Sequence, residues 1–356
     1  SKFALRMKSG FTVSKLAFNV STVAVQLTGV AQSMVVIGKK NFAIGMSQYT
    51  SNPLRAAREV AEVSAFMAER ETTFHRDIND ILGEIQKGPT ASAYDRWIQN
   101  VAKVGFYLMQ TVQFYGVDVP TWLGAYNQGV KDKGMTDAQA KLHADRMVAR
   151  AQASGQFADR SAFERGTLSH DTRQNGFVRL FTTLGSYMFA KGNIAYEVAG
   201  RTRRDVTGFN AQSFAAAFSG AFDMTLLFTL EAILYNLIKG TLPNMGDDED
   251  ESWTKFLAEE TALSMISTVP FGRDVGSALS GFDAGAYSSI IETMVKPVVQ
   301  LGQFEIDKAL VKAVIGATGT ATGLPSTAIN RVVDAAWRKS EGDDVSPVEV
   351  LMGAKY

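Results

Sequence analysis

The sequence DVPTWLGAYNQGVKDKGMTDAQAKLHADRMVARAQ, at residues 118–152, holds the local signals that decide the fold class. Asp118 stands two residues before Pro120. Proline suits the first turn of a helix, and an acid is favourable at a helix start. The pair therefore predicts that one helix ends at Gly116 and that a second, short helix runs over 121–130.

The second half of the same stretch predicts another helix. Thr136 and Gln139 have the spacing of a capping box, in which the two side chains bond the helix start reciprocally. We expect this helix over 137–154, after a turn at Gly134. The stretch is dense in aspartate, arginine and histidine, so two interpretations stay open at this point: a chemical site, or a helical hairpin with a specified polar interior.

The rest of the chain also has the composition of helices. Residue types with high helix propensity fill the long segments, and strand-like alternation is scarce. Helices are predicted over 12–38, 53–86, 91–116, 177–204, 213–240, 253–267, 284–313 and 326–338. The expected fold class is all-α: an extended multi-helix assembly of amphipathic and hydrophobic helices, with Gly/Ser-rich connections in the C-terminal third.

Shifts in composition divide the 356 residues into four expected parts. They are 1–116 (N-terminal helices with a basic start), 117–205 (polar hairpin and aromatic-rich helix), 206–270 (hydrophobic helix, acidic loop and helix) and 271–356 (Gly/Ala-rich C-terminal helices). The first 50 residues contain lysine and arginine but no acid. Such a start fits phosphate-bearing partners, either nucleic acid or lipid headgroups, and equally a solvated basic arm.

Two segments are candidate membrane or channel helices. Residues 16–38 form a run of 23 residues without a charge, about the length that crosses a bilayer core. Adjacent apolar and polar seams in this run suit helix packing, a wet channel or a membrane surface. Residues 213–240 are the most hydrophobic run, but two acids disfavour a lipid-facing span and leave a buried helix or a span inside an oligomeric channel. The residues singled out are Leu16, Asn19, Val23, Gln26, Val30, Met34, Asp223 and Glu231.

Motifs for chemistry are missing from the sequence. Without cysteine there is no disulfide, thiolate zinc site or cysteine nucleophile, and the 3 histidines form no metal-binding motif. We expect no catalytic, cofactor-binding or metal-binding residues, and we interpret the polar side chains as groups that fix helix packing. These predicted packing residues are Asp118, Pro120, Trp122, Tyr126, Asp145, Arg146, Gln152, Asp159, Arg165 and Asn193.

An ordered series of segments resembles a pattern in very large phage proteins. The segments are NVSTVAVQLTGVAQSM (19–34), DVPTWLGAYNQGV (118–130), MTDAQAKLHADRMVARAQ (135–152), DRSAFERG (159–166) and FVRLFTTLGSYMFAKGN (177–193). Their order and spacing over roughly residues 12–200 are similar to the C-terminal parts of the giant internal virion, or ejection, proteins of short-tailed phages, also described as large polyvalent proteins. The element LPSTAINRVVDAAW (324–337) looks like the tail of such chains.

The resemblance implies a structural role. Such proteins are packaged in the capsid, leave it with the genome, and help to form a conduit across the host envelope. The expected partners are copies of this chain, other phage virion or ejection proteins, host membrane lipids and phage DNA. Two alternatives stay open: a purely intracapsid scaffold, and an accessory segment of a virion-packaged enzyme such as a polymerase, with acids gathered around Asp118, Asp145 and Asp159 in a cleft.

Overall fold

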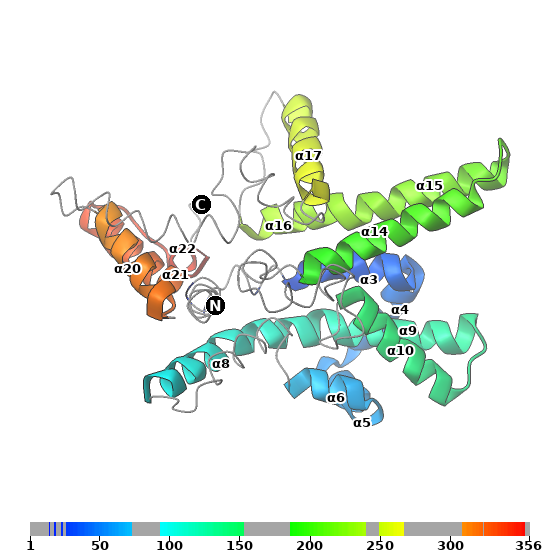
Figure 1. The fold of residues 1–356 in the computed structure, drawn as a ribbon, viewed down its shortest axis with the longest axis horizontal. Helices are drawn as coiled ribbons and strands as arrows, with labels where there is room; N and C mark the ends of the chain where they lie inside the picture. The colour runs from blue at the N-terminus through cyan, green and yellow to red at the C-terminus, as the bar shows by residue number, and fades with distance from the viewer. Residues whose placement is uncertain are drawn as a thin grey trace, which may run out of the picture.

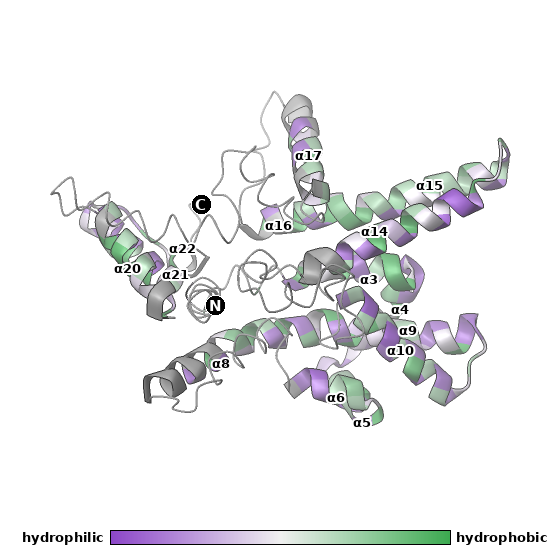
Figure 2. Ribbon diagram, viewed as in Figure 1, coloured by the Kyte–Doolittle hydropathy of each residue, from purple (hydrophilic) through white to green (hydrophobic). Residues whose placement is uncertain are grey.

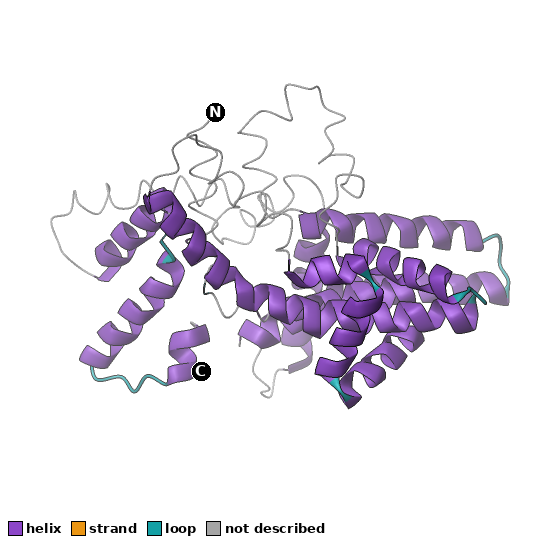
Figure 3. Ribbon diagram, turned by 90° about the horizontal axis from the view of Figure 1, so that it is seen from below, coloured by secondary structure: helices purple, strands orange, loops and turns teal. Residues whose placement is uncertain are grey.

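The computed structural model describes residues 14, 18, 23, 26–72, 93–152, 186–239, 249–266, 308–322 and 324–352. Every regular element among them is helical, and these residues contain no strand (Figures 1 and 3). The predicted all-α fold class is thereby confirmed. The helix predicted over 284–313 can be compared only from residue 308, because residues 284–307 lie outside the described part of the chain.

The N-terminal part is a series of short helices with defined breaks. They are η1 (Gln26–Thr28), α3 (Gly29–Ile37), α4 (Lys39–Ser51), α5 (Pro53–Val63) and α6 (Ala65–Thr72). Gly38, with φ +84°, separates α3 from α4, and Asn52 caps α5 by accepting from the Arg55 amide. The single helix predicted over 53–86 is wrong within its described part. Ser64 has an extended backbone and its hydroxyl accepts from the Met67 amide, which starts a new helix.

A continuous helix over 12–38 is also wrong. Phe18 sits in a turn with φ +60°, a conformation that no helix interior accepts, and it separates the helical Ser14 from the helical Val23 and from α3, which begins at Gly29. The apolar helix Gln26–Ile37 has a length within the range of 10–17 residues. It is too short to cross a bilayer core, which requires roughly 20 residues.

The opening stretch continues a long helix where a helix start was predicted. α8 (Ala93–Gln113), the π-helical η2 (Phe114–Asp118), α9 (Val119–Asn127) and the π-helical η3 (Gln128–Asp132) follow one another without a break. Asp118 has helical dihedrals, φ −68° and ψ −48°, and its side chain caps nothing. A wide turn, in which the Val119 amide bonds the Phe114 carbonyl, accommodates Pro120, which has no amide hydrogen to donate.

The second helix of the stretch agrees with its prediction. α10 (Asp137–Gln152) follows a turn at Gly134, which has φ +61°. The Thr136 amide donates to the Gln139 side chain at 3.1 Å, and the Gln139 amide donates to the Thr136 hydroxyl at 3.4 Å. The predicted capping box is confirmed.

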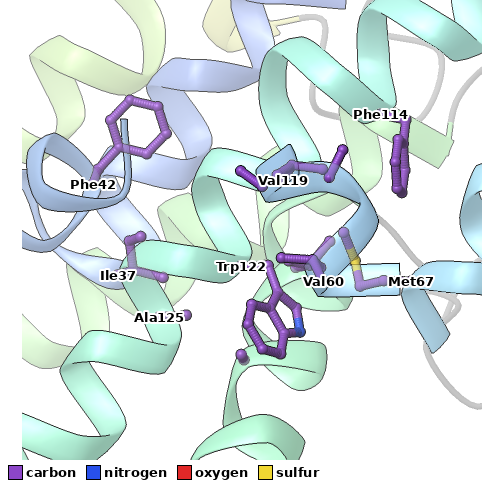
Figure 4. Close-up of a cluster of buried hydrophobic side chains, with 12 residues drawn as sticks. Ile37, Phe42, Val60, Met67, Phe114, Val119, Trp122 and Ala125 are labelled. Carbon is purple, nitrogen blue, oxygen red and sulfur yellow. The ribbon is translucent and has the colours of Figure 1, made fainter. Parts of the chain in front are cut away.

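The main core lies where α4 crosses α9. A Cβ on Gly45 would lie 2.2 Å from the Pro120 carbonyl oxygen, and a Cβ on Gly124 would lie 2.4 Å from the Asn41 carbonyl oxygen. Two glycines thus bring the helix backbones into direct contact. Around this crossing pack Ile37, Phe42, Val60, Met67, Phe114, Val119, Trp122 and Ala125, together with Ala56, Ala57, Ala144 and Val148 (Figure 4).

A helical hairpin follows later in the chain. α14 (Ser186–Asp205) and α15 (Ala211–Thr225) run side by side, and the helix continues through the π-helical η5 (Leu226–Leu230) into α16 (Glu231–Lys239), against which α17 (Glu249–Ile266) packs (Figure 1). A second cluster of buried side chains joins the hairpin to α3: Val35, Ile194, Val198, Leu227 and Phe228.

The last three helices lie together at one end of the view in Figure 1. They are α20 (Lys308–Thr322), α21 (Ser326–Ser340) and α22 (Pro347–Met352), the last of which was not predicted. The predicted end of a helix at 313 is wrong, because α20 runs through the glycines to Thr322. A Cβ on Gly319 would lie 2.5 Å from Ser326 Cβ, so this glycine permits close approach of α20 and α21.

Candidate functional site

The polar residues of the opening stretch lie in a buried network. Asp118, 1% exposed, binds Arg70 of α6, whose Nε donates to Asp118 Oδ2 at 2.5 Å. Gln113 Nε2 donates to Asp118 Oδ1 at 3.0 Å and to Gln152 Oε1 at 3.1 Å. The two oxygens of the Asp118 carboxylate therefore both accept hydrogen bonds, which is what a buried charge requires.

The same network continues to α3. Gln152 Nε2 donates to the Gly29 carbonyl and to Ser33 Oγ, both at 2.8 Å, and Thr121 Oγ1 bonds Ser33 Oγ at 2.7 Å. Side chains and backbone from α3, α6, α8, α9 and α10 meet in this one network. The buried polar groups of this network are hydrogen-bonded to one another, and these bonds fix how the five helices dock.

A second polar contact joins α9, α10 and the start of α6. Trp122 Nε1 donates to Asp145 Oδ1 at 2.8 Å, and Ser64 Oγ donates to the same oxygen at 2.6 Å. The Tyr126 ring stacks on Trp122 with centroids 5.4 Å apart, and its hydroxyl donates to Asp137 at 2.8 Å. This hydrogen bond raises the pKa of Tyr126 and, after the larger effect of Lys141, contributes to lowering that of Asp137.

His143 belongs to a third polar cluster. Its Nε2 lies 2.9 Å from Gln128 Oε1, while Gln128 Nε2 donates to the Ile37 carbonyl at 2.9 Å. Lys133 Nζ lies 3.4 Å from the same ring nitrogen. Burial lowers the pKa of His143, and the charges of Lys133 and Arg146 lower it further, so the fold favours the neutral imidazole.

One buried polar side chain has no partner among the described residues. Gln32, in the middle of α3, is completely buried, and neither its amide nitrogen nor its amide oxygen has a hydrogen bond. Such a group loses its hydrogen bonds to water without compensation on folding. The unbonded amide of Gln32 therefore lowers the stability of the fold, next to Ser33, whose hydroxyl is hydrogen-bonded.

The two acids of the hydrophobic run are both paired. Asp223, in α15, lies 2.6 Å from Lys39 Nζ of α4 and 2.6 Å from Arg201 Nη2 of α14. Glu231 lies 3.0 Å from Lys191 Nζ, and this lysine is 0% exposed. Burial lowers the pKa of Lys191, while Glu231 acts in the opposite direction. These pairs tie α15 and α16 to neighbouring helices.

The hairpin nevertheless leaves much apolar surface exposed. Among the described residues one helix, Ala211–Leu234, passes the length and composition test for a membrane span, and only 33% of its most apolar window is buried. A pocket of about 390 Å³ is lined by apolar side chains of α3 and α14, among them Val35 and Ile194, and by Arg150, Arg201 and Arg204. Apolar side chains and arginines thus line the same pocket.

The remaining predicted packing residues divide into three groups. Pro120 is buried at the α4–α9 crossing. Arg146 and Asn193 were expected in the polar interior, but both are exposed, because each faces away from the helices that pack on α10 and α14. Asp159 and Arg165 lie outside the described residues.

Four side chains of the buried network were not predicted as packing residues: Arg70, Gln113, Thr121 and Ser33. A visible signal existed for Ser33, because it belongs to the polar seam of an uncharged helical segment. Polar side chains in such a segment require polar partners once the helix is buried. Arg70 and Gln113 stand in segments of mixed polarity, where nothing local distinguishes a buried polar side chain from a solvated one.

The predicted channel residues are also dispersed. Val23 is buried, whereas Gln26, Val30 and Met34 are partly buried against neighbouring helices. Leu16 and Asn19 lie outside the described residues. In the described ranges no group of three histidine or acidic side chains is placed to hold a metal ion. Comparisons with known protein families, with curated proteins and with solved structures found no match for this chain.

Proposed function

We propose that this chain is a structural segment of a phage virion protein, ejected with the genome and assembling into a core or channel for DNA delivery across the host envelope. The identity rests on the resemblance of the ordered segments to giant ejection proteins. The observation that carries the role is the exposed apolar surface of Ala211–Leu234, of whose most apolar window only 33% is buried. A surface of this kind marks a site for a partner subunit or a membrane.

The buried polar networks support the structural part of the proposal. In each, hydrogen-bond donors from neighbouring helices occupy the acids of the opening stretch: Asp118 is held by Arg70, and Asp145 by Trp122 and Ser64. A carboxylate occupied in this way positions helices. The accessory-enzyme alternative requires acids gathered in a cleft around Asp118 and Asp145, and the occupied carboxylates favour the structural role.

The first test is the assembly state of the full chain with and without lipid. Mass photometry in detergent is expected to show discrete oligomers, and co-sedimentation is expected to show chain bound to liposomes after a high-salt wash. A monomer that ignores lipid of every composition would contradict the channel role. That result would favour the intracapsid scaffold, for which binding to DNA or to other virion proteins is the next measurement.

A further inference from the structure

Helix α15 of the α14–α15 hairpin carries a stripe of exposed phenylalanines. Phe214, Phe218 and Phe222 are 76%, 67% and 44% exposed and recur every four residues, so they share one face of α15. Phe209, in the connection between the two helices, is fully exposed. No charged residue occurs from Val206 to Phe222. Lys39 Nζ lies 4.6 Å from the centroid of the Phe222 ring and covers part of it. The three more exposed rings, Phe209, Phe214 and Phe218, form an apolar surface on this uncharged element that a partner is expected to cover.

Arginines lie beside this stripe. Arg201, Arg203 and Arg204 are exposed in the last turns of α14, which pack beside α15 near Gly220 and Asp223. Figure 2 shows the contrast: the end of α14 is hydrophilic, and the adjacent α15 is largely hydrophobic. An apolar face flanked by cations has the composition of elements that lie in the boundary between lipid headgroups and acyl chains, where anionic lipids attract the cations.

The ion pairs of the hairpin limit how deeply it can enter a bilayer. Asp223 is held by Lys39 and Arg201, and Glu231 is held by Lys191, so each acid within Ala211–Leu234 is fixed to another helix. If this helix crossed a bilayer, both acids would enter hydrocarbon, either unpaired or with the packed helices that hold them. Both outcomes are costly. The phenylalanine stripe lies before Asp223, so its entry into the headgroup boundary leaves the pairs intact.

We infer that the α14–α15 hairpin is a peripheral anchor for an anionic bilayer: the phenylalanine stripe enters the headgroup boundary, and Arg203 and Arg204 bind lipid phosphates, while Arg201 stays paired with Asp223. The inference rests on the proposed function, because that function brings the chain to a host membrane. It adds the element that makes the contact, the lipid class, and a surface position in place of a span.

Vesicle binding by the full chain tests the contact. Wild type and the triple variant F214S/F218S/F222S are co-sedimented with vesicles of phosphatidylglycerol or of phosphatidylcholine. We expect wild type to bind phosphatidylglycerol vesicles at least tenfold more tightly than phosphatidylcholine vesicles, and the triple variant to lose at least tenfold. The matched control is V104S/Y107S/L108S, which removes similarly exposed apolar side chains from α8 and should change binding less than twofold.

A charge variant tests the lipid class separately. R203E/R204E should remove the preference for phosphatidylglycerol, whereas R58E/K103E, at exposed positions on α5 and α8, should retain it. Circular dichroism of each variant confirms that the helices form. If wild type binds vesicles and the phenylalanine variant binds equally well, the anchor is overturned while the proposed function stands. If wild type binds no vesicle, the anchor and the membrane part of the proposed function are both overturned.

The depth of the hairpin distinguishes an anchor from a span. Because the chain has no cysteine, Phe209→Cys provides a single site for an environment-sensitive fluorophore. Quenchers placed near the lipid headgroup are expected to act more strongly than quenchers at the end of the acyl chain. Stronger quenching from the bilayer centre would overturn the surface position and favour a transmembrane hairpin.

Discussion

Arg70 and Asp118 form an ion pair at 2.5 Å between α6 and the π-helical turn before α9, with the two side chains 14% and 1% exposed. The residues are 48 positions apart, so the pair joins distant parts of the chain. Its consequence is that the first acid of the opening stretch is a packing element. The polar density of residues 118–152 is thereby explained by helix docking.

Asp118→Ala is expected to destabilise the fold by about 3–5 kcal/mol, since it leaves a largely buried arginine without its carboxylate. Urea unfolding followed by circular dichroism measures the change. The control is Glu59→Ala, which removes the exposed partner of Arg55 and should have little effect. Equal effects of the two substitutions would show that the Arg70 pair contributes no more than a surface pair.

Gly124→Ala is expected to destabilise the α4–α9 crossing by more than about 1 kcal/mol, because the added Cβ meets the Asn41 carbonyl oxygen at 2.4 Å and backbone must move. The control is Gly200→Ala, whose Cβ meets only an Arg204 side-chain nitrogen at 3.6 Å. There the better helix propensity of alanine should stabilise the fold by up to about 1 kcal/mol. Thermal unfolding of the two variants should therefore shift in opposite directions.

The sequence predicted helices better than it predicted their ends. The capping box at Thr136 and Gln139 is a local signal, and the structure confirms it. Pro120 is an equally local signal, but the helix start that it predicted is wrong, because the helix continues through this position. The helix passes the proline through a π-helical turn, and α9 then packs against α4 at Gly45, a residue distant in sequence. Tertiary packing of this kind leaves no trace in a local pattern.

The polar network shows the same limit. Asp118 and Gln152 were predicted as packing residues, but Arg70, their shared neighbour, stands in the segment 53–86, for which only a helix was predicted. The helix predicted over 53–86 has no break at Ser64, where α5 ends and α6, which carries Arg70, begins. Residue type indicated that a partner was needed, and only the arrangement of helices determines which residue supplies it.

Gln32→Met is expected to stabilise the protein by about 1–3 kcal/mol. The substitution keeps a flexible side chain of similar volume and removes two buried amide atoms that have no hydrogen bond. The comparison is Gln152→Met, at an equally buried glutamine whose amide bonds Gly29, Ser33 and Gln113; that variant should be destabilised. A loss of stability in Gln32→Met would mean that the Gln32 amide is bonded in solution, for example by a buried water.

His143 is expected to titrate with a pKa below its ordinary value of 6.5. The folded state then takes up its proton at lower pH than the unfolded state, so its contribution to stability is complete above pH 6.5 and is lost as pH falls toward the folded pKa. NMR titration measures the pKa, with the resonance assigned from its absence in His143→Gln. Lys133→Glu should raise this pKa, and an unchanged value would exclude Lys133 as a contributor.

Lys191 and Glu231 give a prediction that separates pairing from packing. Glu231→Ala should destabilise the fold by about 3–5 kcal/mol, because Lys191 is fully buried and loses the carboxylate at 3.0 Å. The double variant K191M/E231M should recover most of that loss, since it removes both charges. The methionine that replaces the lysine would still pack against Phe228, over whose ring the lysine nitrogen lies at 4.7 Å. Urea unfolding of both variants measures the difference. Additive losses in the double variant would indicate that the two side chains stabilise the hairpin independently.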